Sequence, residues 1–128
     1  PPTPKAARFQ PDVLTAPGEA DAQPVEVRVL AGPQDDQFAT DALTQLTSRP
    51  YRVSVDSNRM GYRLEGPVIA HTSGPDIVPD ATPVGTLQVP GSGQPVVLMA
   101  DRQTTGGYAR LATVISADIG VVAQVSPG

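Results

Sequence analysis

Between Gly85 and Tyr108 the chain reads GTLQVPGSGQPVVLMADRQTTGGY, and this stretch decides the fold class. Gly85 to Pro90 has the pattern of a short strand, and Gly91-Ser92-Gly93 that of a turn. Pro95 to Ala100 is a continuous apolar run, which predicts a strand buried on both faces. The polar residues 101–107 stand at the end of that strand, where binding sites tend to be found.

Short strands and turns continue on both sides of this stretch. Downstream, Tyr108 to Ser116 is strand-like, and Ala117 to Val125 predicts a short helix that Gly120 weakens. Upstream, apolar and polar residues alternate from Tyr51 to Leu64 on either side of a polar turn, which predicts a β-hairpin. The intervening segment, His71 to Pro83, is rich in Gly, Pro and small polar residues, so we expect a surface loop there.

The first part of the chain predicts a tail, a strand and a short helix. Pro1 to Pro24 has six Pro and no hydrophobic period, which predicts a linker or a disordered tail. Val25 to Val29 alternates apolar with charged residues, as a half-buried strand does. A short helix is predicted over Thr40 to Thr47, with Thr40 as its N-cap and Asp41 in its first turn.

The composition fits a single β domain. A chain of 128 residues has room for one modest core, and 12 Gly with 15 Pro favour a turn-rich β fold over a helix bundle. Six or so strands with one or two short helices predict a mainly β fold over residues 25–128. These strands are more compatible with a closed barrel than with a sandwich that has long open edges, and the choice of a barrel also rests partly on a family resemblance.

Charge and residue usage exclude several classes of function. Nine Lys and Arg against 13 Asp and Glu give a net charge of −4, and the basic residues are scattered, so we expect no nucleic-acid partner. With no Cys and only His71, the chain lacks a thiol nucleophile and the ligand set of a zinc site, and we expect no bound metal. The longest apolar run, Val96 to Ala100, is too short to span a membrane, so a cytoplasmic location is expected.

The strongest candidate for a site is Asp101 to Tyr108. Two adjacent glycines could turn their N–H groups toward one point and form an anion-binding nest beside Arg102, Gln103 and two Thr hydroxyls. Such a nest would hold a carboxylate, an amide or a phosphate. The alternative is a tight connection between strands, in which Asp101 and the hydroxyls only satisfy turn amides.

Two further stretches carry candidate residues. Ser57 to Arg63 contains two arginines that a ligand carboxylate could meet, although the same pattern fits a hairpin with solvated side chains. Gly32 to Asp36 places Asp35 and Asp36 together, for acid–base chemistry or Mg²⁺, or simply for capping the following helix. His71 is interpreted as an exposed residue without function.

Together these stretches resemble the C-terminal part of the allophanate hydrolase subunit 2 family, also called the Kip antagonist family or the family of the 5-oxoprolinase C subunit. The resemblance covers about Val25 to Pro127. It is carried by GPQ at 32–34 with Asp36 and Phe38, SNRMGYRLEGP at 57–67, the quoted stretch from Gly85, and ATVISAD at 112–118. Departures from the family pattern are Ala109 and Gly120 in place of Pro, and Asp80-Ala81 in place of an acidic-Gly pair.

The resemblance implies a cyclophilin-like β-barrel that forms the second half of a longer subunit and lacks its closing strand. It implies a complex with a Kip inhibitor-like protein (allophanate hydrolase subunit 1), which hydrolyses 5-oxoproline to glutamate at the expense of ATP. The isolated chain should then bind without turning over. Related urea carboxylases carry a proline-serine-leucine loop where this chain has residues 102–105, which favours the 5-oxoprolinase side.

A small amide or lactam is therefore expected between the barrel and its partner. We expect catalytic roles for Asp101, Arg102 and Gln103, with Asp101 orienting Arg102 or acting as a base. The residues expected to bind substrate are Arg59, Arg63, Thr104, Thr105, Gly106, Gly107 and Tyr108. The alternatives are an allophanate hydrolase or urea carboxylase-type carboxyltransferase component, the only one in which biotin takes part, and a non-catalytic antagonist of a Kip inhibitor-like protein. A peptidyl-prolyl isomerase is suggested by the barrel alone.

Overall fold

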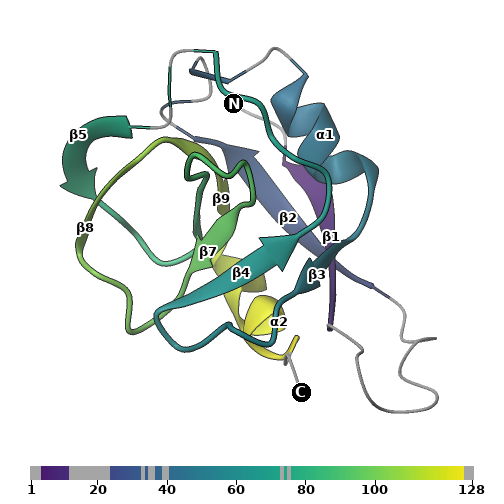
Figure 1. Ribbon diagram of the computed structural model, residues 1–128. Coiled ribbons are helices and arrows are strands. Elements are labelled where there is room, and N and C mark those ends of the chain that lie inside the picture. Colours follow the sequence, from purple (N-terminus) through teal and green to yellow (C-terminus); the bar gives the residue numbers. More distant parts are fainter. Residues whose placement is uncertain are drawn as a thin grey trace.

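Seven strands close into a barrel in the computed structural model, which describes residues 4–11, 24–32, 34, 37–38, 41–72, 74 and 76–125 (Figure 1). In hydrogen-bonded order around the wall they are β1 (Lys5–Pro11), β2 (Val25–Ala31), β9 (Arg110–Val114), β6 (Thr86–Gln88), β7 (Val96–Leu98), β4 (Gly61–Glu65) and β3 (Tyr51–Val53). A parallel pairing of β1 with β3 closes the wall. Two further strands, β5 (Asp76–Ala81) and β8 (Thr105–Tyr108), form a separate antiparallel ribbon.

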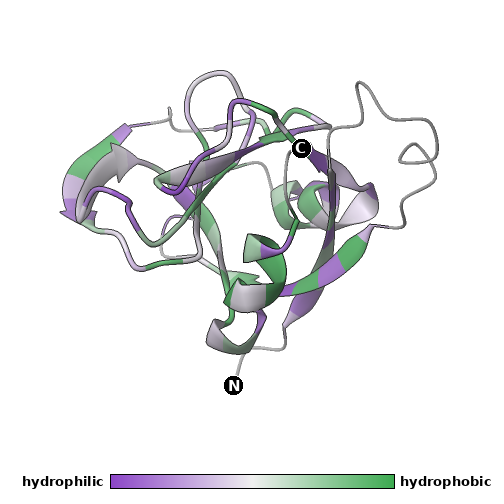
Figure 2. Cartoon of the chain, turned by 90° about the horizontal axis from the view of Figure 1, so that it is seen from below, coloured by the Kyte–Doolittle hydropathy of each residue, from purple (hydrophilic) through white to green (hydrophobic). Residues whose placement is uncertain are grey.

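The helical elements whose bounds lie within the described residues are α1 (Ala42–Ser48), the 3-10 turn η3 (Ser116–Asp118) and α2 (Ile119–Ala123). Figure 2 views the chain from the end where η3 and α2 lie, and it shows α2 as mostly hydrophobic. No helix in the described ranges is long and apolar enough to cross a membrane. The mainly β barrel with short helices that the sequence predicts is confirmed.

The core fills the inside of the barrel, because alternate residues of each strand point inward. The inward positions are fully or almost fully buried, and green and purple bands along the strands show the alternation (Figure 2). They include Ala7, Phe9, Val27, Val29, Tyr51, Val53, Leu64, Leu87, Val89, Val97, Leu111 and Val114. Burial of each large apolar side chain contributes about 1.5–3 kcal/mol to the stability of the fold.

The interpretation of Pro1 to Pro24 as a linker is wrong for residues 5–11. These residues form β1, which pairs antiparallel with β2 on one side and parallel with β3 on the other. Of residues 5–10 of this strand, whose burial the structure describes, only Ala7 and Phe9 reach the core. Two inward residues, one of them a small Ala, give a hydrophobic period too weak to recognise in the sequence. Residues 12–23 lie outside the described part of the chain.

Three other expectations are corrected. The segment His71 to Pro83 is not a loop throughout, because Asp76–Ala81 is strand β5, paired with β8 across an irregular register. Both faces of β5 are largely exposed, so it carries no alternating hydrophobic pattern. The closing strand that we expected after the end of the sequence is supplied by β1. Helix α1 begins after Asp41, which is its N-cap and not part of its first turn; the predicted cap Thr40 lies outside the described residues.

A bidentate ion pair fastens the C-terminal helical segment to the barrel wall. Arg28 donates from Nε and Nη2 to the two carboxylate oxygens of Asp118, at 3.0 and 2.8 Å, and from its backbone N–H at 2.8 Å. Only 10% of the Asp118 side chain is exposed. The guanidinium hydrogen bonds, with the backbone N–H, lower the pKa of Asp118 to about 2.

Because the pKa of Asp118 is lower in the folded chain than the roughly 3.9 of an unfolded aspartate, its contribution is complete above about pH 4 and is lost toward pH 2. We therefore expect Asp118→Asn to lower the Tm by several degrees at pH 7, with the difference from wild type shrinking as the pH falls from about 4 to 2. Thermal unfolding followed by circular dichroism at several pH values measures this. The control is Asp56→Asn, at an exposed turn residue. A Tm difference that stayed constant down to pH 2 would contradict the assignment.

Candidate functional site

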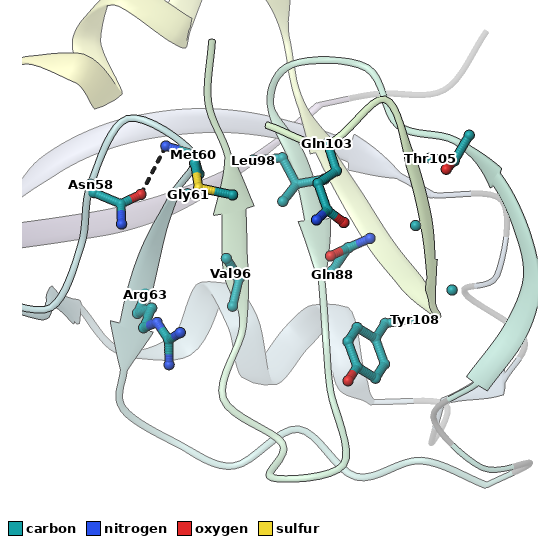
Figure 3. Close-up of a pocket in the computed structure, with 12 residues that line it drawn as sticks. Asn58, Met60, Gly61, Arg63, Gln88, Val96, Leu98, Gln103, Thr105 and Tyr108 are labelled. Carbon is teal, nitrogen blue, oxygen red and sulfur yellow. Dashed lines mark hydrogen bonds between the residues drawn. The ribbon is translucent and has the colours of Figure 1, made fainter. Parts of the chain in front are cut away.

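A pocket of about 350 Å³ lies between the outer face of the barrel wall and strand β8 (Figure 3). Its volume falls in the range of roughly 300–1,000 Å³ that is usual for small-molecule sites. The wall contributes residues from β4, β6 and β7, and the opposite side is formed by β8 with the segment before it. The lining residues are Asn58, Met60, Gly61, Arg63, Gln88, Val96, Leu98, Gln103, Thr105, Gly106, Gly107 and Tyr108.

The period-two alternation of the strands places these residues on the pocket side of the wall. In β7, Val97 is buried in the core, while Val96 and Leu98 face the pocket. The register aligns Arg63, Val96 and Gln88 as cross-strand neighbours in one row over β4, β7 and β6. Both faces of the run Pro95 to Ala100 are therefore apolar, because one face packs in the core and the other forms the floor of the pocket.

The structure brings together two segments that both carry predicted substrate-binding residues, the arginine-bearing hairpin and the connection after β7. Six of the predicted site residues line the pocket: Arg63, Gln103, Thr105, Gly106, Gly107 and Tyr108. Arg63 is exposed, and its guanidinium forms no ion pair or hydrogen bond with another described residue. It is therefore the cation that this pocket offers to a ligand. The chemical roles of all six residues stay predictions.

The other four predicted residues do not line the pocket. Arg59, whose side chain is 83% exposed, pairs with Asp101 at 3.1 Å. We expected Asp101 to orient Arg102, but the two side chains do not pair in this structure. Arg102 instead donates from Nε to the carbonyl of Thr82 at 2.6 Å and from Nη1 to that of Ala100 at 3.3 Å. Thr104 is exposed, and its carbonyl accepts from the N–H of Thr82. These contacts hold the connection in place beside the pocket.

The predicted anion-binding nest at Gly106-Gly107 is not formed. Both glycines belong to strand β8, and neither has a positive φ, which a nest requires. The register pairs Gly106 with Asp80 of β5, and this pairing keeps the backbone extended. Gly106 is needed for a different reason: a Cβ at this position would lie 2.2 Å from Nε2 of Gln88. The missing side chain makes space for the Gln88 carboxamide.

A buried arginine at the start of β9 holds the β5–β8 ribbon against the barrel. The side chain of Arg110 is 8% exposed and donates to Oε1 of Gln34 at 3.0 Å, the carbonyl of Ala81 at 2.6 Å and the carboxylate of Asp80 at 3.1 Å. The backbone N–H of Ala81 and the Arg110 guanidinium lower the pKa of Asp80 below its usual value. Ala81, a departure from the family pattern, needs no left-handed backbone here.

The remaining candidates lie away from this pocket. His71 is not the exposed residue that we expected: it is half-buried, its Nε2 lies 2.8 Å from the carbonyl of Val89, and its ring packs on Phe38 at 4.8 Å. Asp35 and Asp36 lie outside the described residues, so the acid–base or Mg²⁺ interpretation of their loop stays a prediction.

Sequence reasoning missed half of the pocket: Asn58, Met60, Gly61, Gln88, Val96 and Leu98. Gln88 leaves a signal, because it is a polar residue between the apolar Leu87 and Val89. Val96 and Leu98 leave a second one, since apolar residues at the outward positions of a barrel strand indicate that something covers them. Neither signal identifies the segment that provides the cover.

Comparison with known proteins places the chain in a family. Residues 1–128 match the family described as carboxyltransferase domain, subdomain A and B. The chain belongs to this carboxyltransferase domain family. It is 41% identical over 102 residues to the C subunit of 5-oxoprolinase from Escherichia coli (strain K12), and 38% identical over 102 residues to the protein of the same name from Haemophilus influenzae. These matches confirm the family resemblance seen in the sequence.

Solved structures of this carboxyltransferase family share the fold. The crystal structure of Kluyveromyces lactis urea carboxylase superposes with a TM-score of 0.71 at 27% identity, covering 78% of this chain and 10% of that one. The aligned segment covers 80% of this chain and 33% of each of the two bacterial relatives. The chain thus spans about a third of the length of the curated relatives it matches.

The two glycines of β8 should respond differently to a methyl group. In Gly106→Ala the new Cβ meets Nε2 of Gln88, so we expect the carboxamide to move into the pocket while the free energy of unfolding changes by only about 1 kcal/mol. In Gly107→Ala the nearest atom is the carbonyl oxygen of Ile77 at 3.6 Å, an ordinary contact, and Gln88 should stay in place. Crystal structures of the two variants test this, and a Gln88 side chain in the same position in both would show that the close approach is not the constraint.

Proposed function

We propose that this chain is part of a subunit of an ATP-dependent hydrolase complex that opens a lactam, 5-oxoproline, to give glutamate. The observation that carries the proposal is the pocket that Arg63, whose guanidinium has no partner among the described residues, lines together with polar residues from the β8 side, in a chain 41% identical to a 5-oxoprolinase subunit. A carboxylate such as that of 5-oxoproline matches Arg63 by charge and geometry.

The polar groups opposite Arg63 suit the rest of such a substrate. Gln103 and Thr105 line the same pocket and offer a carboxamide and a hydroxyl, which donate and accept hydrogen bonds. The lactam, or its phosphorylated form, would lie between this surface and a partner subunit. The two bacterial relatives are named as one subunit of 5-oxoprolinase, which implies for those proteins an assembly of several subunits. We propose a Kip inhibitor-like protein as the partner, in a cytoplasmic complex.

ATP is proposed for the assembled complex and not for this pocket. A triphosphate needs several cationic or N–H donors, and Arg63 is the one lining residue with a positive charge among the residues that the structure describes. Arg59 and Arg102 are close in the sequence to the lining residues Arg63 and Gln103. Arg59 already pairs with Asp101, and Arg102 already bonds the carbonyl of Thr82. Phosphate contacts would therefore come from other parts of the complex.

A second candidate, a urea carboxylase-type carboxyltransferase component with biotin, is favoured by the likeness to the Kluyveromyces lactis urea carboxylase structure. That match has 27% identity, against 41% for the 5-oxoprolinase subunit. A non-catalytic antagonist of a Kip inhibitor-like protein is the third. All three candidate functions are compatible with the same barrel, so they are distinguished by which substrate, if any, the complex turns over.

The proposal is tested with the intact subunit and its partner subunits, by measuring ATP hydrolysis with 5-oxoproline, urea and allophanate in turn. We expect turnover with 5-oxoproline, and a loss of about 10- to 100-fold in kcat/KM for Arg63→Ala, mostly through KM, because a charge-assisted contact to the substrate is removed. Arg102→Ala is a poorer test, because Arg102 holds the carbonyls of Ala100 and Thr82.

The matched control is Arg52→Ala. Arg52 is an exposed arginine on β3, outside the pocket, and its replacement should leave kcat/KM within about twofold. Turnover of urea or allophanate without 5-oxoproline would favour the carboxylase candidate. A complex that forms but shows no ATP-dependent hydrolysis of any of the three would favour the regulator.

A further inference from the structure

The carboxamide of Gln88 is a buried polar group without a protein partner in the described chain. The residue is 8% exposed, and its side chain forms no hydrogen bond with another described residue. A buried amide left unpaired costs about 1–3 kcal/mol, and most buried side-chain amides are paired. Its neighbours Leu87 and Val89 point into the core, while Gln88 points out of the barrel wall into the pocket.

Two features keep this carboxamide where a ligand can reach it. Gly106 passes directly over Nε2 on one side, since a Cβ there would lie at 2.2 Å. The apolar side chains of Val96 and Leu98 line the floor of the same pocket on the other side. Figure 3 shows the Gln88 carboxamide between Gln103 and Tyr108, directed into the space that these residues surround. Hydrogen bonds in such an apolar setting are stronger than in open solvent.

The chemistry of a carboxamide limits the ligands that can satisfy it. One edge of the amide presents a C=O acceptor beside an N–H donor, whichever way round the group sits. A ligand pairs with both at once only if its own N–H and C=O lie on the same edge. Lactams, ureas and primary amides have this cis arrangement, whereas an ordinary trans peptide bond places the two groups on opposite sides. A carboxylate has two acceptors and no donor, and so pairs with only half of the edge.

We infer that Gln88 recognises the cis-amide edge of the ligand through two reciprocal hydrogen bonds, an inference that rests on the proposed lactam hydrolase function and specifies how its pocket selects substrate. Arg63 and Gln88 are separated in their row by Val96 alone. With strands about 4.8 Å apart, their Cα atoms lie roughly 10 Å from each other, so both side chains can reach one small molecule between them. The site fits a ligand with a carboxylate at one end and a cis-amide at the other.

The same pairing separates substrate from product. Hydrolysis adds water across the lactam C–N bond, so that the carbonyl becomes a carboxylate and the nitrogen becomes an ammonium group. The cis edge no longer exists in the opened molecule. Gln88 then loses one of its two hydrogen bonds and faces a charged group in an apolar pocket, which weakens binding of the product relative to the lactam.

The test is calorimetric titration of the intact subunit in its complex, without ATP, using 5-oxoproline and its N-methyl derivative, which lacks the N–H donor. We expect the wild type to bind 5-oxoproline about 30-fold more tightly, because the N-methyl ligand loses the N–H donor and leaves the buried Gln88 carbonyl oxygen without a partner. Gln88→Leu should weaken 5-oxoproline binding by about the same factor and bring the two ligands within about threefold. Gln124→Leu, at an exposed glutamine after α2, is the control and should bind as the wild type does.

The outcomes separate this inference from the proposed function. If Gln88→Leu binds 5-oxoproline as tightly as the wild type, the inference fails while the lactam hydrolase proposal stands. If urea or acetamide binds in place of 5-oxoproline and Gln88→Leu removes that binding, the inference holds and the 5-oxoprolinase proposal fails. If the wild type binds none of these, the inference fails. If Gln88→Leu does not fold, two other measurements decide whether Gln88 recognises the ligand. One is the binding of both ligands to Gln88→Glu, which keeps the size of the side chain but loses its donor. The other is the comparison of 5-oxoproline with its N-methyl derivative in the wild type.

Discussion

The burial of one guanidinium determines where the candidate site can be. Arg110 leaves the barrel wall with its side chain almost fully enclosed, so its N–H groups must find acceptors or the chain loses several kcal/mol of stability. It finds them in Gln34 and in Asp80 and Ala81 of β5. Since β5 is paired with β8, anchoring one strand fixes the other at a set distance from the wall. The pocket is the space between β8 and the barrel wall, and a bound ligand would contact strands that are held in fixed positions.

The wall beneath the ribbon is apolar on both faces, whereas the outer face of an antiparallel sheet that meets water is usually polar. Inside, Val97 and Leu87 belong to the core; outside, Val96 and Leu98 form an apolar floor, in which Gln88 is the polar exception. A rigid floor with one oriented carboxamide suits recognition of a small planar group, because the binding group is held by the strand and not by a mobile loop. In this arrangement β6 and β7 provide both stability and selectivity.

Much of the barrel could be predicted, because β2, β4, β6, β7 and β9 carry clear local signals. The ribbon could not: β5 is exposed on both faces and is held by Arg110, a contact between residues 30 apart in the chain. The candidate site divides in the same way. Arg63 and Gln103 to Tyr108 stand out as polar or glycine-rich stretches, whereas Gln88 becomes a site residue only when β8 is placed over it. Arg59, Asp101 and Arg102 have residue types that suit catalysis, and in this fold they bond to other side chains and to the backbone, so their functional roles stay predictions.

The strand β1 connects the two ends of the wall, since it pairs with β2 along one side and with β3 along the other. A truncation that began at Val25, the boundary suggested by composition, would remove this strand and leave two neighbouring strands with unpaired backbone N–H and C=O groups. Open edges of this kind associate with other chains. Strand β1 therefore covers two edges that would otherwise be open, and a domain boundary chosen for expression has to lie before Lys5.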